Sequence, residues 1–378
     1  MFVKIITNKN GQIMSNISDH FYTFPAIRGI QAGREYYVSM CPLGHVSKMF
    51  KFDEEDLNPE LRAQRILNKS RIPEIARYIT TNQDNYVFSA ITASIDGDVK
   101  FIPIKDTTEL MRNGTLKIDM SARILVNDGQ HRRAAIEQAI KEDDSLSKES
   151  IAIVFFIDRG LERSQQMFAD LNRHAIRPSR SLGLLYDHRN DMSKIAKLVS
   201  IKANAFKGLV EMERSTLSER SKKLFTLSSI YTGCHALLDG SQVIDLEAAA
   251  NICIAYWDEV AKYMPEWELV RKSRLTSGEI RKDFLHSHGV AIQSLAITGH
   301  QLLNENPKDW KKKLSLIKNI DWSRQNTKVW EGRALIAGKV SKNSTNVSLT
   351  TNVIKQKLGL ELSPEEKRLE QAYKRGQK

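Results

Sequence analysis

The stretch that decides the fold runs from residue 124 to residue 140 and reads ILVNDGQHRRAAIEQAI. Its apolar start, Ile124-Leu125-Val126, is typical of a buried strand, and its alanine-rich end is typical of a helix. Asp128 and Gly129 lie between the two and indicate a turn. The stretch therefore predicts a strand, a glycine turn and a helix in direct succession.

The first turn of this predicted helix is unusually basic. Helix N-termini carry unpaired N–H groups and a partial positive charge, so arginines there are best explained by a bound anion such as phosphate. Glycine lets a ligand approach the backbone closely. The predicted phosphate-binding residues are Gly129, Gln130, His131, Arg132 and Arg133. The alternative is a polar turn whose arginines are only solvated.

The composition is that of a globular protein of 378 residues, with 41% hydrophobic and 27% charged residues, enough for one large or two ordinary domains. The formal net charge of +12 favours a polyanionic partner such as nucleic acid, with an unrelated basic enzyme as the alternative. Cys41, Cys234 and Cys253 lie too far apart for a disulfide framework or a zinc knuckle. With no membrane-length apolar run and no signal-peptide pattern, we expect a cytoplasmic protein.

Strand-like and helical runs alternate in the first half, whereas helical spacing dominates the second. Predicted strands cover residues 36–38, 86–95, 101–104, 115–118, 124–126 and 151–157, and predicted helices cover 60–77 (broken by Pro73), 161–172, 217–238, 245–263 and 288–303. Asp96-Gly97-Asp98 predicts a hairpin that joins 86–95 to 101–104. Residues 332–348 predict a loop or short hairpin. The expected architecture is an α/β (α+β) domain over 1–190 and a mainly helical domain over 191–378.

Two further clusters are candidates for ligand contacts. The predicted helix 161–172 ends at Asn172 and Arg173 and is followed by Arg177; such residues at a helix end contact DNA phosphates, or they form a solvated basic face. If strand 151–157 neighbours strand 124–126, as consecutive strands usually do, this end emerges beside the glycine turn. Residues 24–37 hold two glycines, two arginines and two tyrosines. They line a ligand pocket or form an N-terminal loop and edge strand.

Patterns for catalysis and metal binding are weak. The pairs Cys41 and His45, Cys234 and His235, and His286 and His288 do not complete a ligand set, so no metal site is predicted. Asp128 and His131 are the only catalytic candidates. Residues 350–374 predict two helices around Gly359, but Glu365 and Arg368 occupy positions where a recognition helix needs apolar residues. A plain helical hairpin is therefore favoured over a helix-turn-helix.

At Asp128-Gly129-Gln130-His131-Arg132 the chain resembles the DGQHR-domain family. Residues 24–37, 71–79 and 167–173 extend the resemblance to the DndB proteins, the regulators of bacterial DNA phosphorothioation (DNA sulfur-modification) systems. The second half is similar only in its helical character and in residues 329–332. The resemblance implies a repressor that binds the promoter of the sulfur-modification genes.

The same resemblance implies kinship with the ParB/sulfiredoxin-like fold, a mixed-sheet module. There a glycine-X-X-arginine turn binds nucleotide phosphates, a role that falls here on Gly129 to Arg132, and Asn172-Arg173 resembles that fold's second phosphate box. The chain differs from ParB proteins in lacking an obvious helix-turn-helix after this module, so the element that reads DNA bases stays open.

Three functions are consistent with these features. The first is a regulator that binds double-stranded DNA, is nucleoid-associated, forms a homodimer on paired half-sites and needs no cofactor. The second is an ATPase or DNA-nicking enzyme that binds ATP or CTP with Mg²⁺, in which Asp128 or His131 positions metal or water and Arg132 stabilises phosphate charge. The third is an adaptor for the sulfur-modification enzymes, for which DNA binding is incidental.

Overall fold

The computed structural model describes residues 6–7, 13–14, 21–50, 67–104, 112–157, 161–173, 178–240 and 245–376. Contacts between Cα atoms divide the chain into two compact units, Met1–Ile176 and Arg177–Lys378. Each unit has a hydrophobic core of its own. None of the helices in the described ranges combines the length and the apolarity that crossing a bilayer requires.

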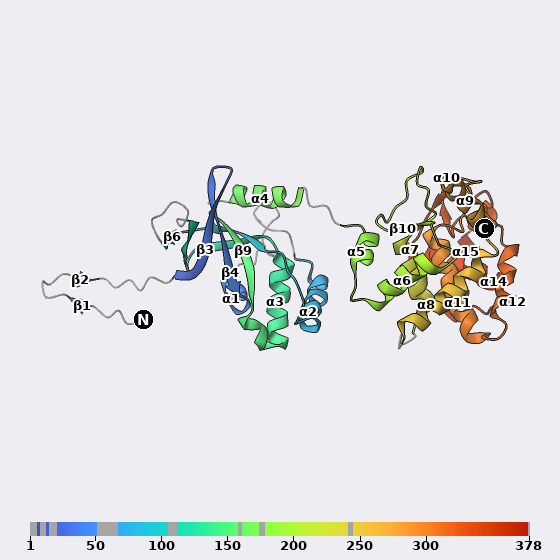
Figure 1. The fold of residues 1–378 in the computed structure, drawn as a ribbon, viewed down its shortest axis with the longest axis horizontal. Helices are drawn as coiled ribbons and strands as arrows, with labels where there is room; N and C mark the ends of the chain where they lie inside the picture. The colour runs from blue at the N-terminus through green and yellow to red at the C-terminus, as the bar shows by residue number, and fades with distance from the viewer. Residues whose placement is uncertain are drawn as a thin grey trace. The chain divides into compact units, whose positions relative to one another are not determined.

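The first unit is built on a seven-stranded mixed sheet (Figure 1), which confirms the predicted α/β character of this half. Its strands are β3 (Phe21–Gln31), β4 (Arg34–Pro42), β5 (Ile91–Asp96), β6 (Val99–Pro103), β7 (Asn113–Asp119), β8 (Arg123–Asp128) and β9 (Ser150–Ile157). They lie in the order β6-β7-β3-β4-β9-β5-β8, and only β5 and β9 pair in parallel. A separate antiparallel pair consists of β1 (Ile6–Thr7) and β2 (Ile13–Met14).

The stretch β5–β6 pairs with the stretch β7–β8, so that together they form a two-stranded ribbon. This ribbon is bent, and it supplies both edges of the seven-stranded sheet. β5 passes into β6 through Gly97 and Asp98, while β6 pairs with β7 and β5 pairs with β8. A Cβ built on Gly97 would lie 2.4 Å from the Cβ of Ala122, so the ribbon bends where its two backbones touch and only glycine fits. The predicted hairpin between 86–95 and 101–104 is therefore wrong. The sheet is strongly curled, because strands at its opposite sides are joined by two residues.

Helices cover both faces of this sheet (Figure 1). The helical elements of the unit are α1 (Leu43–Met49), η2 (Lys69–Arg71), α2 (Ile72–Thr81), α3 (Gln130–Glu142), η4 (Asp144–Lys148) and α4 (Leu161–Arg173). α1, α2 and α3 pack on the face whose core includes Ile153 and Phe155, and α4 lies on the other. Pro73 does not break a helix but lies in the first turn of α2, where its missing N–H is not needed. Residues 60–66 of the predicted helix lie outside the described ranges.

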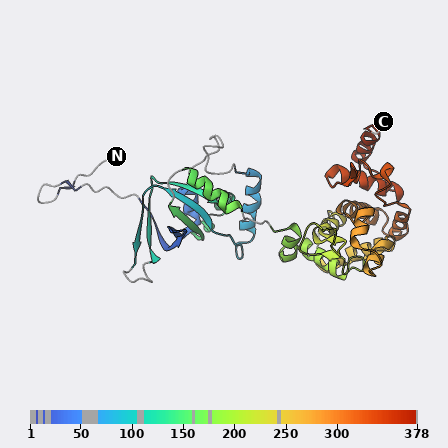
Figure 2. The same ribbon diagram turned by 90° about the horizontal axis from the view of Figure 1, so that it is seen from above.

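The second unit is mainly helical, as predicted; Figure 2 gives a second view of it. Its helical elements are α5 (Arg180–Tyr186), α6 (Asp191–Lys202), α7 (Leu227–Leu237), α8 (Leu246–Ala261), α9 (Pro265–Arg271), α10 (Ser277–Asp283), α11 (Gly289–Glu305), α12 (Trp310–Leu314), η5 (Ser315–Asn319), α13 (Thr327–Trp330), α14 (Ser344–Lys357) and α15 (Pro364–Gly376). Two short strand pairs join β10 (Val210–Glu211) with β11 (Phe225–Thr226) and β12 (Leu335–Ile336) with β13 (Lys339–Val340).

The predicted helices 245–263 and 288–303 and the short hairpin within 332–348 are confirmed as α8, α11 and β12–β13. The predicted helix 217–238 is too long, because α7 begins only at Leu227. There Thr226 and Ser229 form a capping box: the hydroxyl of each accepts a hydrogen bond from the backbone N–H of the other, at 3.2 Å. This capping box fixes the start of the helix.

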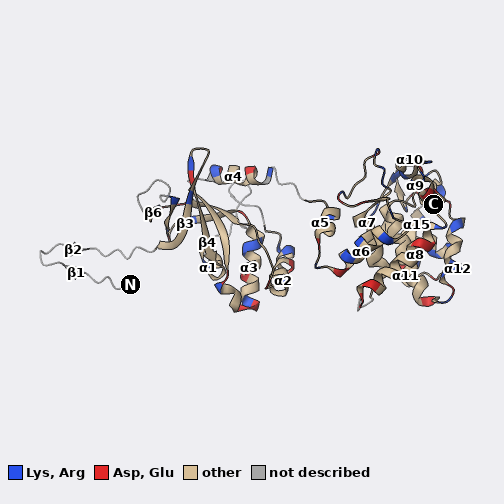
Figure 3. Ribbon diagram, viewed as in Figure 1, with Lys and Arg blue, Asp and Glu red and all other residues tan. Residues whose placement is uncertain are grey.

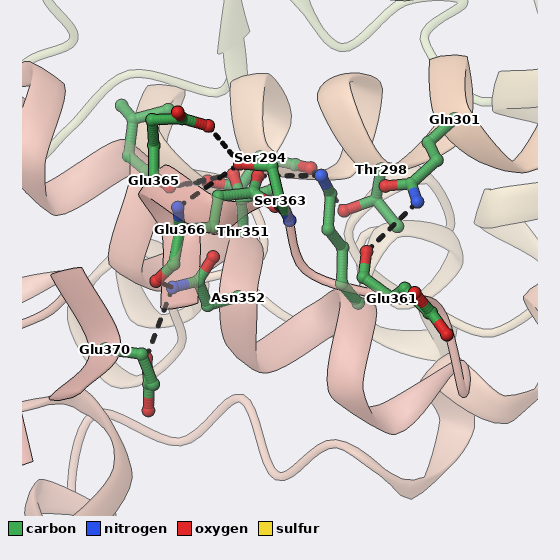
Figure 4. Close-up of polar contacts among 12 residues, drawn as sticks. Ser294, Thr298, Gln301, Thr351, Asn352, Glu361, Ser363, Glu365, Glu366 and Glu370 are labelled. Carbon is green, nitrogen blue, oxygen red and sulfur yellow. Dashed lines mark hydrogen bonds and ion pairs between the residues drawn. The ribbon is translucent and has the colours of Figure 1, made fainter. Parts of the chain in front are cut away.

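As predicted, the C-terminal segment forms two helices around Gly359. Gly359 itself takes a positive φ of 68°. Polar contacts join α15 to α14 (Figure 4). The amide of Asn352 donates to the backbone oxygen of Glu366 at 3.1 Å, and the amine of Lys355 lies 2.7 Å from the carboxylate of Glu366. Beside them, Arg333 and Glu370 form a buried bidentate ion pair with distances of 2.8 and 2.6 Å.

Candidate functional site

The glycine turn is built as the sequence predicts. β8 ends at Asp128, Gly129 has φ 104° and ψ 14°, and α3 begins at Gln130. A Cβ added to Gly129 would lie 3.1 Å from Cγ1 of Ile91 and 3.3 Å from the guanidinium carbon of Arg132. Glycine is required here both for its positive φ and for the lack of space.

Arg132 holds the turn from inside. One of its terminal nitrogens donates to the backbone oxygens of Ser89 at 2.6 Å and Ala90 at 2.8 Å, and also to the hydroxyl of Ser89. The other lies 2.6 Å from a carboxylate oxygen of Asp128. The side chain is only 15% exposed. These contacts join the start of α3 to the backbone that leads into β5, so Arg132 acts as a positioning residue for the turn.

The other residues of the predicted phosphate-binding turn surround the first turn of α3. His131 Nε2 accepts a hydrogen bond from the backbone N–H of Asn68 at 3.1 Å, so in this arrangement that nitrogen carries no proton. Arg133 lies 3.3 Å from the carboxylate of Glu137, one helical turn further along. Gln130 is half-buried at the first position of the helix.

Sequence reasoning missed the segment 68–71, which lies against the start of α3 through the contact from Asn68 to His131. Asn68 caps η2 by accepting from the backbone N–H of Ser70 at 3.2 Å. Lys69 and Arg71 on this segment are exposed. The available signal was a capping asparagine followed by two basic residues before a predicted helix.

The start of α3 can attract an anion. No side chain caps it, so its first N–H groups keep their partial positive charge. Lys69 and Arg71 belong to the exposed segment whose Asn68 contacts His131, and they add positive charge to this part of the unit. Elsewhere in this unit, Lys and Arg are distributed over α2, α3 and α4 instead of forming a single stripe (Figure 3).

The second basic cluster does not lie beside this turn, which corrects the sequence-based expectation. β5 separates β8 from β9, and it runs antiparallel to β8 but parallel to β9. The two strands therefore end at opposite ends of the sheet, and their following helices lie on opposite faces. Of the predicted residues, Arg173 is exposed at the end of α4, Asn172 belongs to α4 without a described side chain, and Arg177 lies outside the described ranges.

Buried polar contacts hold α4 on the sheet. Asn127, next to the glycine turn, accepts a hydrogen bond from the hydroxyl of Ser94 at 2.8 Å and donates to the backbone oxygen of Ser164 at 3.2 Å. All three residues are almost fully buried. The strand that carries the turn is thereby fixed on both faces of the sheet, to α3 and to α4.

The third candidate region, residues 24–37, forms most of the hairpin β3–β4 at the centre of the sheet, so it is not an edge strand. The hairpin and α4 line a cavity of about 360 Å³ that contains Arg34, Arg163 and Asp170. Both tyrosines have partners within the unit. Tyr36 stacks on Phe156 with ring centroids 5.6 Å apart, and Tyr37 is 2% exposed and donates to Glu35 at 2.6 Å.

The two catalytic candidates are both engaged in the turn. Asp128 is half-exposed and pairs with Arg132, and His131 accepts from the backbone of Asn68. Within the described ranges, no three His, Cys, Asp or Glu side chains are grouped as a metal ion would require.

The chain is a two-unit α/β protein, in which a curled mixed sheet is followed by a helical unit. The start of α3 in the first unit is suited to contact an anion such as phosphate. The family model for DndB proteins, described as DNA-sulfur modification-associated, matches residues 24–361. The chain therefore belongs to the DndB family, which is associated with DNA sulfur modification. No curated protein and no solved structure matches the chain.

Proposed function

We propose that the chain is a DNA-binding transcriptional regulator that represses the genes for DNA sulfur modification. Membership of a family associated with this modification supports the biological setting. The net charge of +12 supports a polyanionic partner. The observation that carries the proposal is the start of α3, an uncapped helix N-terminus that Arg132 fixes in place and that the basic segment 68–71 contacts through Asn68.

In this proposal the residues at and near the turn have different roles in binding DNA. The first N–H groups of α3 and the side chain of Gln130 contact one backbone phosphate, while Lys69 and Arg71 contact neighbouring phosphates of the same DNA. Arg132 contributes by holding the turn. Arg173 lies on the other face of the sheet, so a phosphate that it contacts is a different one.

Phosphate contacts alone carry no sequence information, so promoter recognition needs a second element. We assign base reading to the helical unit and propose that two copies of the chain bind paired half-sites.

The two alternative functions, an enzyme and an adaptor, make different predictions. A nucleotide-dependent enzyme turns over ATP or CTP with Mg²⁺, and an adaptor binds the sulfur-modification enzymes in the absence of DNA.

The test is fluorescence anisotropy with a duplex from upstream of the chain's own gene. The double variant Lys69→Ala/Arg71→Ala should weaken binding at least about tenfold and lower the slope of log K against log salt by about 1 for each lost phosphate contact. The matched control is Lys141→Ala, which removes an exposed lysine from the far end of α3. Equal affinities of the double variant and the control would contradict the proposed interface.

A further inference from the structure

The helical unit contains a cavity of about 440 Å³ that is lined mostly by cationic and hydroxyl-bearing side chains, with Leu217, Leu224 and Phe225 as its apolar part. Its basic residues are Arg180, Arg281 and Lys342. No aspartate or glutamate from the described ranges lines it. Three cations around one concave surface repel one another unless an anion lies between them. The arrangement therefore calls for a negatively charged occupant.

The N-terminus of α11, a helix of 17 residues, opens on this cavity through His288 and Gly289. His288 occupies the N-cap position but does not cap the helix, because its Nε2 lies 2.7 Å from the backbone oxygen of Arg281. Within the described ranges, the N-cap residue therefore provides no side-chain acceptor for the first N–H groups of α11. They keep the partial positive charge that binds phosphate at helix starts.

Lys342 lies directly over this helix start. A Cβ built on Gly289 would be 3.4 Å from the amine of Lys342, so the backbone of the first helical residue and the amine face the same space. Burial and the neighbouring charge of Arg180 lower the pKa of Lys342. Desolvation is the larger of the two causes, and the like charge of Arg180 adds to it because no carboxylate from the described ranges lines the cavity.

Ser287 supplies an independent indication of a ligand. The side chain is 4% exposed, it lines the cavity, and its Oγ has no hydrogen-bond partner in the described part of the chain. A buried hydroxyl without a partner is destabilising, so such groups usually contact a ligand or an ordered water. Here the hydroxyl lies two residues before the start of α11.

Arg281 has a different role from Arg180 and Lys342. Its guanidinium donates to the backbone oxygens of Ser277 at 3.1 Å and Ser218 at 2.8 Å. It therefore orders the wall of the cavity while adding to its positive charge. Arg180 is exposed and lies over the ring of Tyr231 at 5.6 Å, which leaves it at the mouth of the cavity.

We propose that this cavity binds the phosphoryl group of a small phosphorylated ligand, with charge from Lys342 and Arg180 and hydrogen bonds from Ser287 and the first N–H groups of α11. The volume exceeds that of a phosphate ion and lies in the range of small-molecule sites, so the ligand has the size class of a nucleotide. The hydroxyls of Thr226, Ser228 and Thr232 provide further polar wall. The site is independent of the α3 turn, and either proposal can fail alone.

The test is isothermal titration of the full chain with inorganic phosphate, a nucleoside monophosphate, a nucleoside triphosphate and a short duplex DNA. We expect a nucleotide to bind more tightly than inorganic phosphate. Lys342→Ala should weaken nucleotide binding by about tenfold or more, the size expected for one charge-assisted contact. Ser287→Ala should weaken it severalfold. The matched control is Lys339→Ala, which removes an exposed lysine of β13 that does not line the cavity.

Thermal unfolding without ligand separates binding from a structural role. Lys342→Ala and Ser287→Ala should keep or raise the melting temperature, because they remove a like-charge contact and an unpartnered hydroxyl. Binding of the duplex alone, lost in both variants, would assign the phosphoryl group to DNA instead of a small molecule and overturn the small-ligand proposal. Absence of binding by every probe at millimolar concentration, or binding that neither substitution changes, would overturn the site itself.

Discussion

The guanidinium of Arg132 lies 2.6 Å from the carboxylate of Asp128 and closes the turn from which α3 begins. The same guanidinium donates to two backbone oxygens that precede β5. The run from Asp128 to Arg132 is thus a structural unit in which the arginine faces the protein interior. Any contact with phosphate at this turn depends on that arrangement.

Replacing Arg132 should therefore affect folding before it affects binding. Arg132→Ala leaves two backbone oxygens and Asp128 without their donor, and we expect it to lower the free energy of unfolding by about 2 kcal/mol or more. Urea denaturation followed by circular dichroism measures the change. The control Arg133→Ala loses only a pair with Glu137 on the helix surface and should cost less than about 1 kcal/mol. Equal losses would contradict the positioning role.

Gly129→Ala tests the turn itself. The φ of 104° and the 3.1 Å approach to Ile91 predict a loss of about 1–2 kcal/mol or more. Gly183→Ala is the matched control, since Gly183 lies in α5 with open space around it, and alanine there should stabilise by up to about 1 kcal/mol. Thermal unfolding of both variants measures the two changes in stability. An unchanged melting temperature for Gly129→Ala would contradict the requirement for glycine at this turn.

The buried pair of Arg333 and Glu370 should be important for the attachment of α15. Glu370→Ala leaves a buried guanidinium without its carboxylate, and we expect a loss of about 3–5 kcal/mol. The control is Lys374→Ala, whose 66% exposed amine is 3.9 Å from the same carboxylate and should contribute less than about 1 kcal/mol. Denaturant titration distinguishes the two, and a loss below about 1 kcal/mol for Glu370→Ala would contradict the importance of the pair.

The stability of the helical unit should depend on pH through His288. Burial lowers the pKa of His288 to about 4. The unfolded chain binds this proton near pH 6.5 and the folded chain only near pH 4, so stability falls as the pH drops through that window, by up to roughly 3 kcal/mol. His288→Asn should flatten the profile between these values relative to the wild type. The exposed His188→Asn should leave it unchanged, and identical profiles for all three proteins would contradict the burial argument.

Local features of the sequence predicted the elements well where short-range rules decide them. Val126, Gly129 and the alanine-rich run define a strand, a turn and a helix by their immediate neighbours. Gly359 and the helices around it follow from the same kind of signal. These elements are found where the sequence places them.

Long-range pairing is what the sequence could not predict. Gly97 looks like a hairpin turn, yet it is a bend, because β5 pairs with β8 and β9 while β6 pairs with β7. The partners of Arg132 are 42 and 43 residues away in the chain, and only the fold brings them together. The same holds for the cavity around Lys342, whose walls come from five separate segments. No local pattern at any one of these segments indicates the site.

The most direct test of the central claim compares two duplexes with the wild-type chain. Fluorescence anisotropy across a salt series should show that a duplex from upstream of the chain's own gene binds about a thousandfold more tightly than a scrambled duplex of equal length, with both affinities falling as salt rises. Equal affinities for the two duplexes at every salt concentration, or no binding at low salt, would contradict the account of this protein as a promoter-specific regulator.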